Sequence, residues 1–109
     1  MPELNEEGPL LDLLKRMTAD SLAASSLDPQ TTMLIRIAAL AAVDAPPASY
    51  LINLEAAAVD GVDPEQVRSV LALVAPIVGT ARVASATAAI VEALAIELEV
   101  AALVEEGVE

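Results

Sequence analysis

The side chains best spaced for chemistry are Ser49, Tyr50 and Asn53, which share one short stretch of the sequence. A helix would place Ser49 and Asn53 on one face, with Tyr50 beside them. Their hydroxyl and amide groups can hydrogen-bond a neutral ligand, and a tyrosine can serve as a general acid. In the alternative, structural interpretation, Ser49 caps a helix, Asn53 satisfies a backbone group, and Tyr50 packs in the core with its hydroxyl at the surface.

Two charged residues interrupt neighbouring apolar segments. Arg36 lies among apolar residues between positions 33 and 43, and Glu55 interrupts the segment that follows. We expect them to form a partly buried ion pair, within a subunit or across an interface, because retained ion pairs often serve specificity. The alternative is that Arg36 clamps a carboxylate ligand.

Several kinds of chemistry are excluded by what the sequence lacks. It contains no cysteine and no histidine, so it offers no thiolate, no disulfide, no imidazole base and no group that activates a serine. Asp60, Asp63 and Glu65 form an acidic cluster, but Asp63 is needed as a helix cap and the spacing is not that of a calcium loop. We therefore predict no established catalytic residue, no cofactor and no metal.

The composition predicts one domain that associates with copies of itself. The chain has 109 residues, of which 56% are hydrophobic and only 1% aromatic, so small aliphatic side chains must fill the core. One small domain cannot bury all of these apolar side chains, and self-association is the simplest way to bury the remainder.

The charge argues against two kinds of partner. Seventeen acidic and five basic residues give a net charge of −12, which repels phosphate backbones and anionic membrane surfaces. The longest uncharged run lies between Arg68 and Arg82 and is too short to cross a bilayer. The acidic first twenty residues are unlike a signal peptide. We expect a cytoplasmic protein that binds neither nucleic acid nor membrane.

The spacing of the apolar residues predicts an all-α fold. Intervals of three and four indicate helices and no strand. The five expected helices lie at about 9–25, 29–43, 47–60, 64–78 and 80–106. We predict a single all-helical domain over residues 9–106, a disordered tail at 1–8 and a short tail at 107–109.

Aspartate, proline and glycine mark the helix ends. Asp28 and Asp63 each precede a proline, a combination that caps a helix and opens its first turn. Gly61 supplies the left-handed residue that closes the third helix. The last helix is apolar on nearly every side, and we expect its 83–104 segment to contact another copy or a second protein chain.

The order of these pieces resembles that of the carboxymuconolactone decarboxylase / alkylhydroperoxidase D-like family over about residues 27–90. The matching segments are Leu27-Asp28-Pro29-Gln30-Thr31, Leu40-Ala41-Ala42-Val43, Ala56-Ala57-Ala58-Val59-Asp60-Gly61-Val62-Asp63-Pro64-Glu65-Gln66-Val67 and Leu71-Ala72-Leu73-Val74-Ala75-Pro76-Ile77-Val78-Gly79. The resemblance implies a bundle of five to six helices that packs into homotrimers, or into hexamers built from trimers.

The peroxidase branch of that family carries Cys-x-x-Cys-x-x-x-His, with the histidine eight residues before a later glycine. The same count in this chain places Asn53 at the histidine, and Ser49 and Pro46 at the two cysteines. The glutamate of the preceding helix falls near Met33 or Leu34. None of these side chains supplies the thiolate or proton acceptor of a thiol relay, so the resemblance does not carry over the family's activities.

Three functions remain open at this point. The preferred one is a non-catalytic oligomeric module that acts through assembly. The second is an enzyme of divergent mechanism in the family's usual pocket, using Tyr50, Asn53 and Ser49, with Arg36 and Glu55 nearby. The third is an engineered self-assembling subunit on this scaffold, because charges recur among the Ala, Ile and Leu of segment 88–98 as on designed helix faces.

Overall fold

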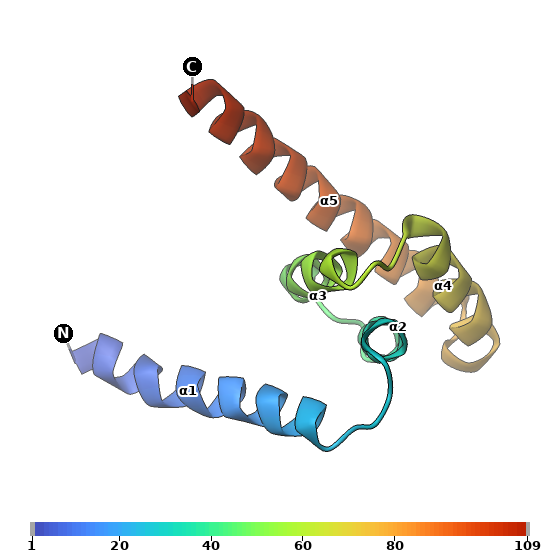
Figure 1. The fold of residues 1–109 in the computed structure, drawn as a ribbon. Coiled ribbons are helices and arrows are strands. Elements are labelled where there is room, and N and C mark those ends of the chain that lie inside the picture. The colour runs from blue at the N-terminus through green and yellow to red at the C-terminus, as the bar shows by residue number, and fades with distance from the viewer. Residues whose placement is uncertain (1, 109) are drawn as a thin grey trace.

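Five helices make up the fold (Figure 1). The computed structural model describes the backbone of residues 2–108 and the side chains of residues 8–95. The helices are α1 (Pro2–Ala23), α2 (Pro29–Ala42), α3 (Pro47–Val59), α4 (Pro64–Val78) and α5 (Thr80–Val108). Residues 2–108 contain no strand, which confirms the predicted all-α fold class.

The two ends of the chain differ from the prediction. The predicted tail at 1–8 is helical from Pro2 onward, because a proline in the first turn of a helix sacrifices no backbone hydrogen bond. At the other end α5 runs without a break to Val108, slightly past the predicted limit at residue 106.

The predicted caps of α2 and α4 are confirmed. Asp28 accepts a hydrogen bond from the backbone N–H of Thr31 at 3.1 Å and another from the Thr31 hydroxyl at 2.6 Å. At α4, Asp63 accepts from the N–H of Gln66 at 2.8 Å, and the Gln66 side chain accepts from the N–H of Asp63 at 2.9 Å. This reciprocal pair is a capping box, and it fixes the residue at which α4 begins.

The cap of α2 makes the fold sensitive to acid. The pKa of the Asp28 carboxyl group lies below its ordinary value. The hydrogen bond from the Thr31 hydroxyl contributes most to this lowering, and the hydrogen bond from the Thr31 backbone N–H contributes less. A group whose pKa is lower in the folded state stabilises the fold above its unfolded pKa, and this contribution is lost as the pH falls through the folded pKa.

We therefore expect the melting temperature of the wild type to drop more steeply than that of Asp28→Asn when the pH falls below about 4. Asparagine keeps a capping oxygen but carries no titrating charge. Circular dichroism melts of the two proteins at neutral and acidic pH would measure the difference. Parallel curves would show that Asp28 contributes nothing through its charge.

The joint between α3 and α4 is built around Gly61. This residue has φ of 86°, a left-handed conformation that glycine adopts without strain. The N–H of Val62 donates to the Ala57 carbonyl at 2.9 Å and the N–H of Gly61 donates to the Ala58 carbonyl at 3.1 Å. These bonds close α3 as the sequence predicts. A Cβ on Gly61 would lie 2.9 Å from Nε2 of Gln30, so the start of α2 packs against this joint.

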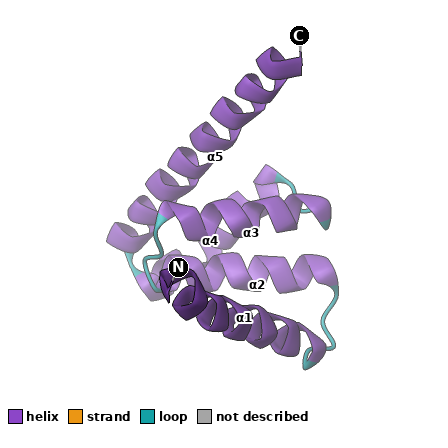
Figure 2. Cartoon of the chain, turned by 90° about the vertical axis from the view of Figure 1, so that its left-hand side faces the viewer, coloured by secondary structure: helices purple, strands orange, loops and turns teal. Residues whose placement is uncertain are grey.

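The helices α2 to α5 form one bundle, from which the C-terminal part of α5 projects (Figure 2). α2 contacts α3, α4 and α5, and α5 also contacts α3 and α4. Among the residues whose placement is described, the backbones of α3 and α4 do not come close to each other, although a short loop joins them and both helices contribute side chains to one core cluster. The two helices therefore stand apart on either side of their neighbours.

Two clusters of buried side chains form the core of this bundle. The first surrounds Tyr50, which is fully buried, with small or aliphatic residues of α2 and α5: Ala41, Ala86, Ala89, Ile90 and Ala93. The second surrounds Ile37, also fully buried, with residues of α2, α3 and α4: Met33, Ala57 and Val70. The alanines allow the helix axes to approach closely, which is how a chain with one aromatic residue builds a packed core.

α1 extends away from the bundle (Figures 1 and 2), and its described residues contact none of the other helices. The radius of gyration is 16.0 Å, whereas a compact domain of this length has about 13 Å. Apolar side chains of α1 are exposed as a result: Leu10, Leu11, Leu13, Leu14, Met17 and Leu22. A single chain thus leaves an apolar helix surface in water.

Candidate functional site

Ser49 and Asn53 lie on α3 as predicted, but their hydrogen bonds serve the helix. The Asn53 side-chain amide donates to the Ser49 carbonyl, one turn back, at 2.8 Å, which confirms the structural interpretation of Asn53. The proposed cap by Ser49 is wrong, because Pro46 occupies the N-cap position of α3 and no side chain caps it. Pro47 opens the first turn instead, and a proline there needs no cap for its own nitrogen.

Tyr50 is enclosed by the first core cluster rather than placed with its hydroxyl at the surface. Its exposed fraction is 0%, and its hydroxyl oxygen is buried with no hydrogen-bond partner among the described groups. The prediction of a surface hydroxyl is therefore wrong, because the alanines of α2 and α5 leave room for the whole ring. Burial raises the pKa of the Tyr50 phenol above its ordinary value, and the negative charge of Asp44 makes a smaller contribution in the same direction. A phenol held neutral in an apolar site is poorly placed to transfer protons.

Arg36 and Glu55 do not pair with each other in the described part of the chain. Arg36 is partly buried on α2, whereas Glu55 is exposed on α3. Between residues 8 and 95 the ion pair that forms is Arg68 with Glu65, one turn apart on the surface of α4. The expected pair within one subunit is therefore wrong, and a pair across an interface stays a prediction.

A polar contact that the sequence did not predict ties the end of α2 to α5. Asp44 follows α2 with φ of 54°, and its carboxylate accepts a hydrogen bond from the Ser85 hydroxyl at 2.5 Å. The Arg82 guanidinium donates to the Ala42 carbonyl, one of the last carbonyls of α2, which have no partner within the helix. Arg82 and Ser85 thus connect α5 to the turn between α2 and α3.

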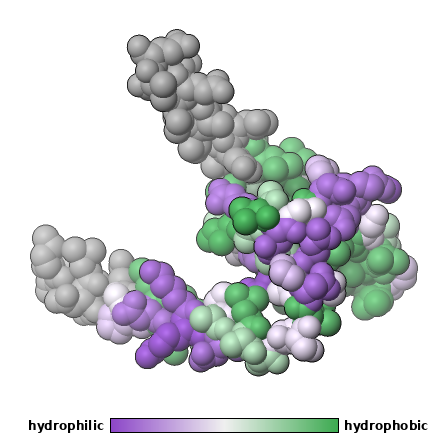
Figure 3. All heavy atoms as spheres, viewed as in Figure 1, coloured by the Kyte–Doolittle hydropathy of each residue, from purple (hydrophilic) through white to green (hydrophobic). Residues whose placement is uncertain are grey.

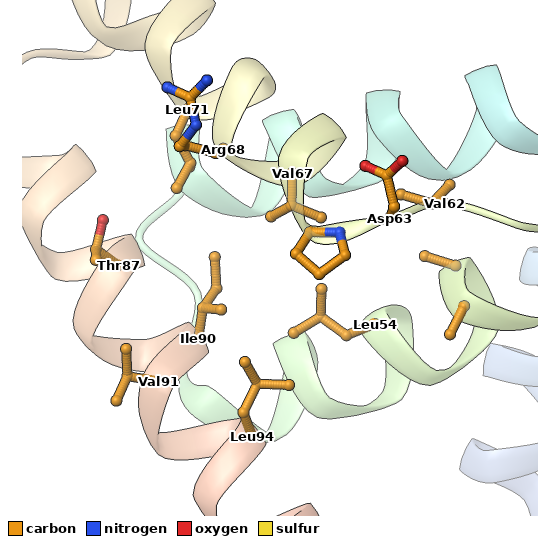
Figure 4. Close-up of a pocket in the computed structure, with 13 residues that line it drawn as sticks. Leu54, Val62, Asp63, Val67, Arg68, Leu71, Thr87, Ile90, Val91 and Leu94 are labelled. Atoms are coloured by element: carbon orange, nitrogen blue, oxygen red, sulfur yellow. The ribbon is translucent and has the colours of Figure 1, made fainter.

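A groove with apolar walls lies between α3, α4 and α5 (Figure 4). Its volume is about 370 Å³, and we call it the α3–α4 groove. Leu54 of α3 and Val67 of α4 face it from opposite sides, with residues of α5 at a third side (Figure 4). Its lining is Leu54, Ala57, Ala58, Val62, Asp63, Pro64, Val67, Arg68, Leu71, Thr87, Ile90, Val91 and Leu94.

The polar side chains at the groove are already engaged. Asp63 holds the capping box, Arg68 is paired with Glu65, and the Thr87 hydroxyl donates to the Val83 carbonyl at 2.9 Å. The lining includes none of the five candidate side chains from positions 36, 49, 50, 53 and 55. The groove is therefore suited to apolar contact, and the structure does not bring the candidate residues to it.

No group of three acidic side chains is gathered for a metal ion within the described residues. In the same part of the chain, no helix combines the length and the apolar character needed to cross a bilayer.

Five helices around an alanine-rich core, with a groove that lacks convergent polar groups, define a small all-α bundle protein. Comparison with protein families then identifies the family: the model of the Carboxymuconolactone decarboxylase family matches residues 9–92. The chain belongs to this family. Searches of curated proteins and of solved structures gave no match. The family match takes in α1 from residue 9, which the segments quoted from 27 to 90 did not include.

Proposed function

We propose that this chain is a carboxymuconolactone decarboxylase-like module that works through self-assembly and does not carry the thiol or histidine chemistry of its relatives. The sequence has no cysteine and no histidine. Of the three aligned positions, Asn53 donates a hydrogen bond to its own helix and Pro46 is the N-cap residue of α3. The α3–α4 groove is lined mainly by apolar side chains and presents no reactive group.

The observation that supports assembly most strongly is the state of α1. A helix of this size draws most of its stability from packing an apolar face, and little from the helix alone. Yet Leu10, Leu14 and Met17 are 58%, 48% and 57% exposed, and α1 contacts no other helix of its own chain in the described part. Neighbouring copies would remove this apolar surface from water.

The bundle also leaves large aliphatic side chains at its surface. Val59 of α3 and Ile77 of α4 are 87% and 85% exposed, and Ile52 and Leu73 are 69% and 76% exposed. In the space-filling view, hydrophobic residues of the bundle gather in patches between hydrophilic ones (Figure 3). Contiguous apolar patches on a protein surface mark sites that contact other protein chains. The contact predicted for the last helix at 83–104 belongs to the same proposal, and its part beyond residue 95 lies outside the described side chains.

Size-exclusion chromatography with light scattering tests the proposal. The chain has a mass of 11.2 kDa, and we expect a trimer or a multiple of a trimer at micromolar concentration. A monomer across this range would overturn the assembly role. A peroxide-reduction assay with a dithiol reductant should show no rate above buffer, and a measurable rate would overturn the non-catalytic half of the proposal.

A further inference from the structure

We propose that the bond between Asp60 and Gly61 is a modification site, where the aspartate converts to isoaspartate when the joint between α3 and α4 opens. The conversion needs no enzyme and no co-reactant other than water. In the closed joint, the backbone geometry holds the reacting atoms apart. The extent of conversion therefore records how often the joint has opened.

The reaction joins the side chain of Asp60 to the backbone of the next residue. The backbone nitrogen of Gly61 loses its proton to solvent and attacks Cγ of Asp60, and the hydroxyl of the carboxyl group leaves as water. The product is a five-membered succinimide ring. Water then opens the ring at one of its two carbonyl carbons, which restores aspartate or gives isoaspartate. No electron is transferred, and the water lost in the first step returns in the second.

The sequence favours this reaction at one aspartate. Asp60 is the one aspartate in the sequence that glycine follows, and glycine has no side chain to obstruct the approach of its nitrogen to the carboxyl group. Asp28 and Asp63 precede prolines, whose nitrogen carries no hydrogen to lose. The carboxylates of these two residues are also engaged as helix caps.

The closed joint holds the Gly61 nitrogen away from the Asp60 side chain. Asp60 has φ of −83° and ψ of 6°. A ψ near zero places the Gly61 nitrogen almost eclipsed with the Asp60 nitrogen, whereas ring closure requires it to be nearly eclipsed with the Asp60 Cβ. The Gly61 N–H also donates to the Ala58 carbonyl at 3.1 Å. The attack therefore requires a rotation about ψ of Asp60 and the loss of this hydrogen bond.

The residues that follow oppose this rotation. The N–H of Val62 donates to the Ala57 carbonyl at 2.9 Å. Directly after it, the capping box of Asp63 and Gln66 fixes the start of α4. Rotating ψ of Asp60 displaces this segment, so these bonds and the one from Gly61 break together. The reaction thus requires local opening of the joint, and local opening does not require the whole bundle to unfold.

The joint lies at the surface, so water reaches the ring once it forms. Val59, Gly61 and Asp63 are exposed, and Asp60 is partly buried. Isoaspartate carries the main chain through its side-chain carbons, which adds one carbon to the backbone between α3 and α4. The hydrogen bonds that close α3 at Gly61 and Val62 then lose their geometry. The modified joint therefore cannot close as it did before.

Incubation in water labelled with oxygen-18 tests the proposal on the full-length chain. Each ring opening adds one heavy oxygen to the reacting aspartate, whichever product forms. The wild type is incubated at neutral pH with and without guanidinium chloride, and digestion after glutamate then releases residues 56–65 as one peptide. We expect label at Asp60 in the denatured chain, at least about tenfold less in the folded protein, and none at Asp63, the control in the same peptide.

Two outcomes of this experiment would overturn the proposal. A denatured chain without label at Asp60 would mean that the bond is not a modification site. Equal label in the folded and denatured chains would mean that the closed joint does not hold the reacting atoms apart.

Gln66→Ala distinguishes opening of the joint from unfolding of the bundle. It removes the hydrogen bond that the Asp63 N–H donates to Gln66, so it should raise the rate at Asp60 several-fold. Ser85→Ala is the matched control, because it also removes one hydrogen bond, to Asp44 beyond the other end of α3. Its rate should stay within about twofold of the wild type. Equal rates in the two variants would contradict local opening of the joint, and circular dichroism would verify that both are folded.

Discussion

Replacing Tyr50 with alanine should lower the free energy of unfolding by about 3–5 kcal/mol, the range found when a buried large side chain is truncated. The ring is fully buried at the centre of the first core cluster. Its neighbours are mostly alanines, which cannot extend into the space that the ring would leave. Chemical denaturation at a fixed chain concentration measures the loss, since dissociation of subunits makes stability depend on concentration.

Tyr50→Phe is the matched control, and it should behave in the opposite way. The Tyr50 hydroxyl is buried without a partner among the described groups, and an unsatisfied buried polar group costs about 1–3 kcal/mol. Removing it should therefore leave stability unchanged or raise it by about 1 kcal/mol. A phenylalanine variant clearly less stable than the wild type would show that the hydroxyl has a partner in the assembled protein.

Ile37→Ala should cost about 2–5 kcal/mol, because it opens a cavity in the second core cluster. Ile37 lies on α2 and is fully buried in a cluster with residues of α3 and α4. The same denaturation experiment measures this change. A loss below about 1 kcal/mol would mean that the cluster collapses around the smaller side chain.

Ile35 provides the control for this substitution, since it has the same side chain on the same helix. It is 51% exposed, so Ile35→Ala should change stability by no more than about 0.5 kcal/mol. Equal losses at the two positions would place the outer face of α2 in a buried contact with another copy.

The fold was predictable where local chemistry determines it. Asp28 and Asp63 before proline fixed the starts of α2 and α4, and Gly61 fixed the end of α3, because caps and left-handed residues act within one turn of the chain. The start of α1 was missed, since the polar residues before position 9 have no apolar periodicity to reveal a helix.

The candidate site was less predictable, because its geometry depends on contacts between distant segments. The pairing of Asp44 with Ser85 joins residues 41 positions apart, and nothing local to either residue indicates it. The complete burial of Tyr50 depends on alanines of two other helices. The α3–α4 groove lies where the backbones of two helices adjacent in sequence stay apart. Apolar periodicity shows which face of a helix is buried, but not which helix faces it.

The most direct test of whether copies of this chain complete one another is hydrogen exchange at the amides of α1 in the wild-type protein. Within one chain the described part of α1 has no helix to pack against, so strong protection of its amides must come from a neighbour. We predict that the amides of residues 10–22 exchange as slowly as those of α2. Exchange at the rate of an unstructured peptide, with α2 to α4 still protected, would contradict the proposal that neighbouring copies cover α1.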